Sequence, residues 1–438
     1  MPPVRSLQQW PRGPRNELHK AARFGSADRT RAILSSGAFD INQGDPEGIT
    51  PLMLASLEGY AHIVKILLDN GANVSIVASD SGTALNVAAQ NGHAAVAKIL
   101  VDAGSDIEGQ TSDGCTPLHV AAYEGHPEVM RVLIEAGANP NSRISDGSTP
   151  MYSAAFKGHT EAVRILIRAK ASPRFVVTSP SGNRFVPLDM AAQYGHSGVV
   201  RELLREHGIK GCAGVTAGVR ALRGAAQQQH VGVMAMLAEA GVADTGGQAL
   251  VVAAEFGRED SVKFLIGLQE ERREAARVAY VSDTLDPYGR TPVLSSIDVS
   301  PEHSCSPRIV RMLIDAGAAT AGVARITNML GEVAFNDTPL GITRRILRER
   351  KIYGRDATTE QLHKLEAVRR LLLRVAAVRA SSWLWPSLCS DDTLALAEGK
   401  AKAEKTETPL ATMFPVLRRR ARRRTALLAP LFRYSSRR

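Results

Sequence analysis

The chain is poor in aromatic residues and in cysteine. Phe, Trp and Tyr make up 5% of its 438 residues, whereas hydrophobic residues reach 44% and are mostly Ala, Leu, Val and Ile. Small aliphatic side chains suit thin helices that pack closely. The four cysteines, Cys115, Cys212, Cys305 and Cys389, are scattered, so no disulfide framework or zinc site is visible. We expect a reduced, intracellular chain that needs no cofactor and no metal.

Long apolar runs are absent as well. No stretch approaches the roughly 18 uninterrupted apolar residues of a membrane helix. Residues 1–20 contain several prolines and arginines but no apolar run, which is not the pattern of a secretory signal. We expect a protein that is soluble, is not secreted, and works in the cytoplasm, the nucleus or both.

The common catalytic motifs are also lacking. The sequence contains no Gly-x-Ser-x-Gly, no His-Glu-x-x-His and no phosphate-binding loop that ends in Gly-Lys-Ser/Thr. The glycine-rich segment Gly211–Gly218 lacks the spacing of a nucleotide site, and we interpret it as a loop between repeat units. We therefore expect neither an enzyme nor a small-molecule substrate. An unfamiliar active site in residues 270–400 is disfavoured, because no nucleophile–base pair is arranged there.

What the chain does have is a repeated glycine. Gly71, Gly104 and Gly137 lie 33 residues apart, and Gly37 precedes Gly71 by 34. The words before them also repeat, as Ile-Leu-Leu-Asp-Asn-Gly, Ile-Leu-Val-Asp-Ala-Gly and Val-Leu-Ile-Glu-Ala-Gly. A fixed period in this range indicates stacked structural repeats rather than one closed core.

The clearest repeat unit carries the signals of two short helices. Thr116 is a good N-cap and Pro117 fits the first helical position. Gly125 and Gly137 end the two helices, as a left-handed residue after a helix favours glycine. Each helix has one apolar stripe at helical spacing, formed by Leu118, Ala121 and Ala122 in the first and by Val129, Val132 and Leu133 in the second.

This unit resembles the ankyrin repeat. The word Thr-Pro-Leu-His-x-Ala occurs at Thr116 to Ala121, and the period agrees. The resemblance implies an all-α repeat solenoid of helix-turn-helix units with short β-hairpin fingers, about 8–10 units in number. It also implies a non-enzymatic scaffold or adaptor that binds a protein partner through its concave face and its finger tips.

The regularity of the repeat changes along the chain. Lys170 stands where the glycine is expected, so we expect a longer or differently capped turn there. We divide the chain into a flexible segment at 1–15, regular repeats at 16–171, divergent repeats at 172–268, degenerate repeats with insertions at 269–378, and a basic, disordered tail at 379–438.

Two residues precede the turn glycine of each first helix and lie away from its apolar stripe. In ankyrin-like arrays these positions line the groove, and several of them are aromatic in this aromatic-poor chain. Because aromatic residues are favoured interface anchors, we predict a groove centred on Tyr123, Phe156 and Tyr194. The alternative is that the rings fill gaps between adjacent units. The predicted partner-binding residues are Phe24, Glu58, Asn91, Tyr123, Glu124, Phe156, Lys157, Gln193, Tyr194 and Phe256.

Histidines recur with the repeat. His93, His126, His159 and His196 each follow a glycine at one position, and His119 lies in the Thr-Pro-Leu-His word. Such a set could suggest metal binding or acid–base chemistry. Their periodicity favours structural roles instead, in which the rings bond backbone groups of each unit.

The net charge of +10 is concentrated at the C-terminal end. Lys400–Arg438 holds 12 of the 54 Lys and Arg but only two of the 44 Asp and Glu, so the rest of the chain is balanced. Three interpretations stay open: a signal for a nuclear import receptor, a segment for an anionic surface (nucleic acid or acidic lipid), and a solvated tail without a role. Either of the first two makes the chain a nuclear or membrane-surface regulator. The basic run is Arg418, Arg419, Arg420, Arg422, Arg423 and Arg424.

Overall fold

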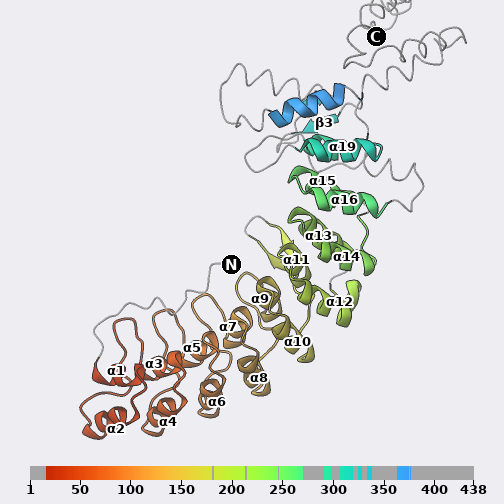
Figure 1. Cartoon of the computed structure of the whole chain (residues 1–438). Coiled ribbons are helices and arrows are strands. Elements are labelled where there is room, and N and C mark those ends of the chain that lie inside the picture. Colours follow the sequence, from red (N-terminus) through yellow and green to blue (C-terminus); the bar gives the residue numbers. More distant parts are fainter. Residues whose placement is uncertain are drawn as a thin grey trace, which may run out of the picture. The chain divides into compact units, whose positions relative to one another are not determined.

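The structure is a computed structural model (Figure 1). It describes residues 16–179, 182–212, 215–244, 246–269, 291–296, 306–318, 324–327, 333–337, 363–373 and 375. The chain divides into two compact units, Met1–Leu373 and Arg374–Arg438. All the helices and strands named below belong to the first unit.

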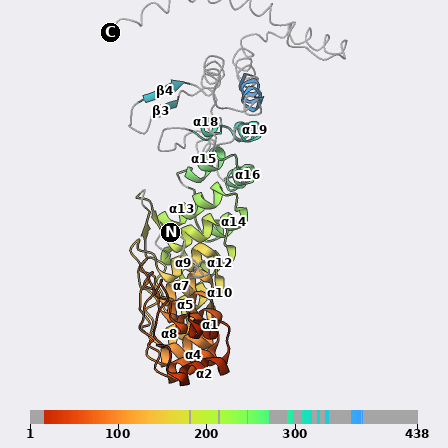
Figure 2. The same ribbon diagram turned by 90° about the vertical axis from the view of Figure 1, so that its left-hand side faces the viewer.

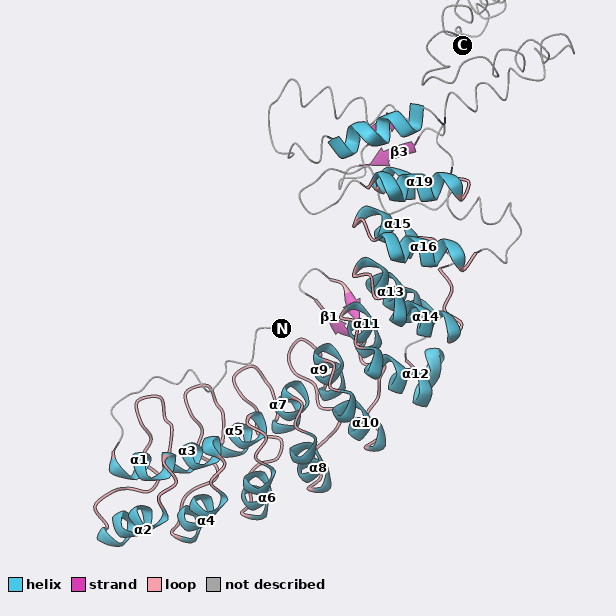
Figure 3. Ribbon diagram, in the orientation of Figure 1, coloured by secondary structure: helices cyan, strands magenta, loops and turns pink. Residues whose placement is uncertain are grey.

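Most of the described chain consists of short helices that come in consecutive pairs (Figures 1 and 3). The first helices of the pairs are α1 (Glu17–Arg23), α3 (Pro51–Glu58), α5 (Ala84–Gln90), α7 (Pro117–Glu124), α9 (Pro150–Lys157), α11 (Pro187–Gln193), α13 (Val215–Gln227), α15 (Gln248–Glu255) and α18 (Pro292–Ser295). The second helices are α2 (Ala27–Ser36), α4 (Ala61–Asp69), α6 (Ala94–Asp102), α8 (Pro127–Glu135), α10 (Thr160–Arg168), α12 (Ser197–Gly211), α14 (Val231–Glu239), α16 (Glu259–Gly267) and α19 (Pro307–Asp315).

The pairs stack in the order of the sequence. Each first helix contacts the first helices of the neighbouring pairs, from α1 through to α18, and the second helices form their own row from α2 to α19 (Figures 1 and 2). Contacts between elements are thus made within a pair or between neighbours. This arrangement confirms the predicted all-α repeat solenoid.

The helix starts follow the sequence signals. The hydroxyls of Thr50, Thr83, Thr116 and Thr149 each accept a hydrogen bond from the backbone N–H three residues on, and Pro follows three of these four threonines. An N-cap bond of this kind is worth about 1 kcal/mol. The repeated threonine therefore fixes where each first helix begins.

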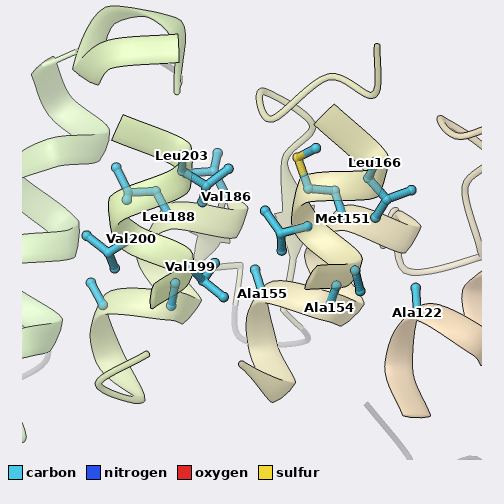
Figure 4. Packing of buried hydrophobic residues seen from close by; sticks show 14 of the residues in the cluster. Ala122, Met151, Ala154, Ala155, Leu166, Val186, Leu188, Val199, Val200 and Leu203 are labelled. Atoms are coloured by element: carbon cyan, nitrogen blue, oxygen red, sulfur yellow. The ribbon is translucent and has the colours of Figure 1, made fainter. Parts of the chain in front are cut away.

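The core runs between the two rows of helices as one continuous cluster (Figure 4). Ala154 and Ala155 of α9 are fully buried beside Met151 of the same helix and Leu166 of α10. Ala122 occupies the matching position on α7. Since alanine adds almost no thickness to the helix, neighbouring first helices approach closely, as the small-residue stripe predicts.

The turn at Lys170 corrects one expectation. Lys170 adopts φ 61°, in the left-handed region, and its N–H bonds Ile167 O at 2.9 Å. The glycine turn one unit earlier has the same pattern, with Gly137 N–H to Ile134 O at 3.0 Å. The turn is therefore neither longer nor differently capped, because lysine takes the conformation that glycine normally occupies.

The fingers between units are tight turns, one of which contains strands. β1 (Val177–Thr178) and β2 (Arg184–Phe185) pair antiparallel in the longest finger. The shorter fingers bond one another, with Ser79 N–H donating to Glu47 O at 2.9 Å and Ser112 N–H to Asp80 O at 2.8 Å. Adjacent fingers are thus tied together at the backbone.

The later units depart from the regular pattern. Helix α12 has a break in helical geometry at Gly208, where φ is 61°, and resumes as far as Gly211. Helix α13 already begins at Val215, so the expected loop at Gly211–Gly218 is wrong at both of its ends. Two strands that the sequence did not predict, β3 (Ala324–Thr327) and β4 (Val333–Asp337), pair antiparallel across a bulge. Residues 363–373 are helical. Much of the stretch 269–378, where degenerate repeats with insertions were expected, lies outside the described residues.

Candidate protein-interaction surface

The predicted partner-binding residues lie at the C-terminal ends of the first helices, where helix gives way to turn. Their burial varies: Phe24 is 76% exposed and Tyr194 is 49% exposed, while the rings of Tyr123 and Phe156 are half-buried. Glu58 and Lys157 are exposed, and Glu124, Gln193 and Phe256 are half-buried. The surface is therefore mixed in polarity, with its largest rings at the middle units.

Three of these rings form a continuous row across three units. The rings of Tyr123 and Phe156 are stacked, with centroids 6.5 Å apart and an interplanar angle of 13°. Phe156 meets Tyr194 edge-on at 4.9 Å. We call Tyr123, Phe156 and Tyr194 the aromatic ladder. Both geometries are favourable for aromatic pairs.

The sequence left open whether these rings anchor a partner or fill gaps between adjacent units, and the structure is compatible with both. The rings do fill the space between adjacent units, because each touches the next. They also keep a face or an edge in solvent, most of all Tyr194. The ammonium of Lys157 lies 4.5 Å from the centroid of the Tyr123 ring, a cation–π contact on an exposed side chain.

A small apolar cluster that the sequence did not predict supports the ladder from below. Tyr152 of α9, Met190 of α11 and Val177 of β1 are buried together, with Phe156 and Phe185 packed against them. The long finger thereby holds the central ring of the ladder. The only sequence signal was the apolar composition of that finger, whose fold could not be read from a repeat pattern that the other fingers do not share.

The recurring histidines bridge neighbouring units. Nε2 of His93, His126 and His159 lies 2.9 Å from the carbonyl oxygens of Leu57, Gln90 and Tyr123, respectively. His196 reaches Phe156 O at 3.0 Å in the same way. Each ring thus donates to the end of the first helix one unit earlier, which confirms a structural role. Two of these carbonyls belong to ladder residues.

His119 is also structural. Its Nδ1 lies 2.9 Å from Thr116 Oγ1 and its Nε2 lies 3.3 Å from Ser148 O at the entrance to the next unit. Burial lowers the pKa of His119 to about 4, because the charged imidazolium would lose its hydration there. In the preceding unit Asn86 takes the same position and donates to Gly109 O at 3.3 Å.

The first units form a different kind of surface. Arg23 and Glu58, from adjacent first helices, form an ion pair at 3.5 Å. The Asn91 amide donates to Val87 O of its own helix at 2.9 Å, so that side chain is held by the backbone. Phe24, within the part of the chain that the structure describes, shares no ring contact with the ladder. Among the described residues, the structure therefore brings only part of the predicted set together.

Other kinds of site find little support in the described part of the chain. There, no three His, Cys, Asp or Glu side chains gather in a way that could hold a metal ion. Cys115 and Cys212 are buried free thiols, and burial raises the pKa of Cys115 to about 11, which makes it a poor nucleophile. None of the described helices is both long and apolar enough to cross a membrane.

The basic run of six arginines, Arg418 to Arg424, lies outside the described residues, as do Cys305 and Cys389. The three interpretations of the tail therefore stay predictions.

Two rows of short stacked helices, joined by capped turns and bearing half-exposed rings at the helix ends, define a helical repeat protein with a side-chain surface suited to recognition. The sequence profile of ankyrin repeats, which spans three copies, matches residues 7–78, 75–144 and 140–214. Residues 7–214 of the chain are therefore ankyrin repeats. The chain is similar to an ankyrin repeat protein of Fowlpox virus (strain NVSL), with 41% identity over 68 residues.

That similarity covers 16% of this chain and 15% of the viral protein. It therefore identifies repeats and not a shared biological role. Ankyrin repeats generally act in protein–protein interaction.

Proposed function

We propose that the chain is a scaffold or adaptor that binds a protein partner across the ends of its first helices and the adjoining fingers, with the aromatic ladder at the centre. The observation that carries this proposal is the ladder itself, three rings from three units in mutual contact and still open to solvent. Tyr and Trp rings of this kind recur among the residues that contribute most to binding. The repeats at 16–268 form the binding array in this proposal.

The ladder is well prepared for binding because its rings are already ordered. Phe156 contacts the rings of Tyr123 and Tyr194 and packs against the buried cluster of Tyr152, Val177 and Met190. The carbonyls of Tyr123 and Phe156 are fixed by His159 and His196. A partner therefore loses little free energy to ordering these side chains, which costs about 0.5–1.5 kcal/mol for each mobile side chain immobilised.

A quantitative capture experiment tests the proposal. The full chain, tagged in its native cell, is compared with the double variant Tyr123→Ala plus Phe156→Ala by proximity labelling and mass spectrometry. The matched control is Lys65→Ala plus Arg201→Ala, two exposed residues on the second helices α4 and α12. Loss of two interface rings should lower recovery of specific partners about tenfold. Equal recovery with both variants, in chains shown to be folded, would reject the ladder as the binding surface.

The charge distribution favours a second function. The whole excess of +10 lies in Lys400–Arg438, and clustered arginines bind import receptors or anionic surfaces. We propose that residues 379–438 direct the array to the nucleus or to an anionic surface. Truncation after Thr408 should then abolish nuclear or membrane enrichment of a tagged chain, whereas an unchanged distribution rejects this function.

A further inference from the structure

We propose that the segment bound at the ladder is an extended acidic peptide with apolar side chains, whose carboxylates meet Lys157 on one side and Arg223 on the other. This inference rests on the proposed function, because it names the chemistry of the partner at that same surface. It follows from which charges near the ladder are already neutralised and which are not.

Lys157 and Arg223 are the available cations. Lys157 is exposed on α9, stands over the Tyr123 ring and makes no ion pair with any residue that the structure describes. Arg223 is exposed on α13, the first helix of the pair that follows α11 and α12. Within the described chain Arg223 also forms no ion pair. The two cations therefore lie on helices to either side of α11.

The carboxylates near Arg223 are already paired. Asp189 of α11 is buried and accepts from both Nε and Nη2 of Arg220, at 3.1 and 3.0 Å. Arg223 lies close enough to lower the pKa of the Asp189 carboxyl, but burial outweighs both arginines and raises that pKa to about 6. The charges of Asp189 and Arg220 neutralise each other in this ion pair, so Asp189 does not neutralise the charge of Arg223.

Near Lys157 the closest carboxylate in the sequence of first-helix ends is that of Glu124, which follows Tyr123. The Glu124 side chain is half-buried. It does not form an ion pair with Lys157. In the first two units the cation Arg23 is paired with Glu58 of the next first helix. Lys157 and Arg223, by contrast, carry positive charge that no ion pair among the described residues neutralises.

Two other ligand classes fit this surface less well. A basic peptide would meet Lys157, which already occupies the face of the Tyr123 ring that a cation would use. A single-stranded nucleic acid needs free ring faces on which bases stack. Here Tyr123 and Phe156 stack on one another and the Lys157 ammonium lies over the Tyr123 ring, so a base would compete with these contacts for the ring faces. An acidic peptide uses the ring edges and the two cations together.

Fluorescence anisotropy with defined probes tests this inference on the full chain. The acidic probe is a labelled peptide of repeated Glu-Asp-Phe-Leu units, about 12 residues long, a length that spans several repeats when extended. The basic probe is the same peptide with Lys-Arg in place of Glu-Asp, and labelled oligouridine of similar length is the third probe. The variants are Lys157→Glu plus Arg223→Glu, and Lys65→Glu on α4 as the matched control.

We expect the acidic probe to bind the unmodified chain at least about tenfold more tightly than the basic probe, with an affinity that falls as salt rises. The double charge reversal should reverse that order of preference, and Lys65→Glu should leave it unchanged. Because all three substituted residues are exposed, thermal unfolding should be nearly unaffected.

Three results would overturn the inference: no binding of the acidic probe, equal binding of both peptides, or binding of oligouridine in competition with the acidic probe. The proposed function is judged separately. If partner recovery depends on Tyr123 and Phe156 but not on the charges of Lys157 and Arg223, the ladder binds a partner that is not acidic. If recovery depends on neither pair, the ladder is not the binding surface.

Discussion

At the scale of single residues, Lys170 shows how much a turn depends on its place in the repeat. The turn keeps its backbone hydrogen bonds even though a lysine must adopt φ 61° to make them. A side chain with a Cβ is strained in this region by about 1 kcal/mol. The bonds from Lys170 N–H to Ile167 O and from Ala171 N–H to Leu166 O, both 2.9 Å, tie the turn to the end of α10.

Lys170→Gly should therefore stabilise the chain by about 0.5–1 kcal/mol, since glycine takes this conformation without strain. Urea unfolding of the two chains measures the difference. The matched control is Gly137→Ala, where φ is 97° and a Cβ would contact nothing, so that only the backbone conformation is changed. That variant should lose about 1 kcal/mol. Destabilisation by Lys170→Gly would show that the lysine side chain contributes more than its strain.

His119 gives a second residue-scale prediction, on pH. Its pKa is about 4 in the folded chain and about 6.5 when unfolded, so the unfolded state binds the proton more readily. The neutral ring contributes its full stability above pH 6.5, and this contribution falls as the pH drops from about 6.5 to about 4, by up to about 3 kcal/mol.

His119→Asn should flatten that dependence. Asn86 occupies the same position one unit earlier and donates to a backbone carbonyl of the following finger, Gly109 O, so an amide is accommodated at this position and removes the titrating group. The measurement is the free energy of unfolding of both chains from pH 7.5 to about 4. Parallel curves for the two chains would contradict the assigned pKa.

At the scale of elements, neighbouring units are connected by a histidine of one unit, whose ring packs on a glycine of the unit before it. A Cβ on Gly125 would lie 2.5 Å from Nδ1 of His159, so glycine is needed to admit the ring. The ring in turn satisfies the carbonyl of Tyr123 at 2.9 Å. The recurrent Gly-His pair of the sequence is thus an interaction between neighbours, with the glycine of one unit and the histidine of the next.

Removal of this ring in His159→Ala should cost about 1–3 kcal/mol, because a half-buried carbonyl loses its donor and the ring packing is lost. His62→Ala is the control, since His62 is exposed and reaches Gly25 O only at 3.3 Å. It should change the free energy of unfolding by less than about 0.5 kcal/mol. Equal effects of both substitutions in urea unfolding would contradict the bridging role.

The sequence predicted the elements whose residues repeat and missed those that occur once. The Thr-Pro caps and the Leu-Ala-Ala stripe recur, so they predicted the first helices and the core between them. The cluster against which Phe156 packs includes Val177 of the one long finger, which has no counterpart elsewhere in the repeats. The pairing of β3 with β4 has no precedent in the helical pattern either. The ladder was predicted as three candidates, but their contacts required the spacing of the stacked units.

At the scale of the whole molecule, stability comes from neighbouring pairs rather than from one central core. Ion pairs also link the second helices, with Arg131 of α8 joined to Glu161 of α10 at 3.1 Å and Arg164 of α10 joined to Glu202 of α12 at 2.8 Å. The Arg131–Glu161 pair is partly exposed and worth little singly, whereas Glu202 of the second pair is buried. Together the pairs connect adjacent units in series.

A core substitution in one unit should therefore weaken its neighbours. Leu133 is fully buried in α8, and Leu133→Ala should cost about 2–5 kcal/mol. Hydrogen exchange should show lost protection in α8 first, then in α6 and α10, with α16 affected least. Uniform loss of protection across all these helices would mean that the array unfolds as a single cooperative unit.

The central claim is that a partner lies against the aromatic ladder. Site-specific photo-crosslinking tests it most directly, with benzoylphenylalanine in place of Tyr194, which is 49% exposed, or in place of Lys65 on the second helix α4. Irradiation of cells should yield a discrete covalent adduct from position 194 and none from position 65. Adducts only from position 65, or the same adducts from both, would place the partner elsewhere on the chain.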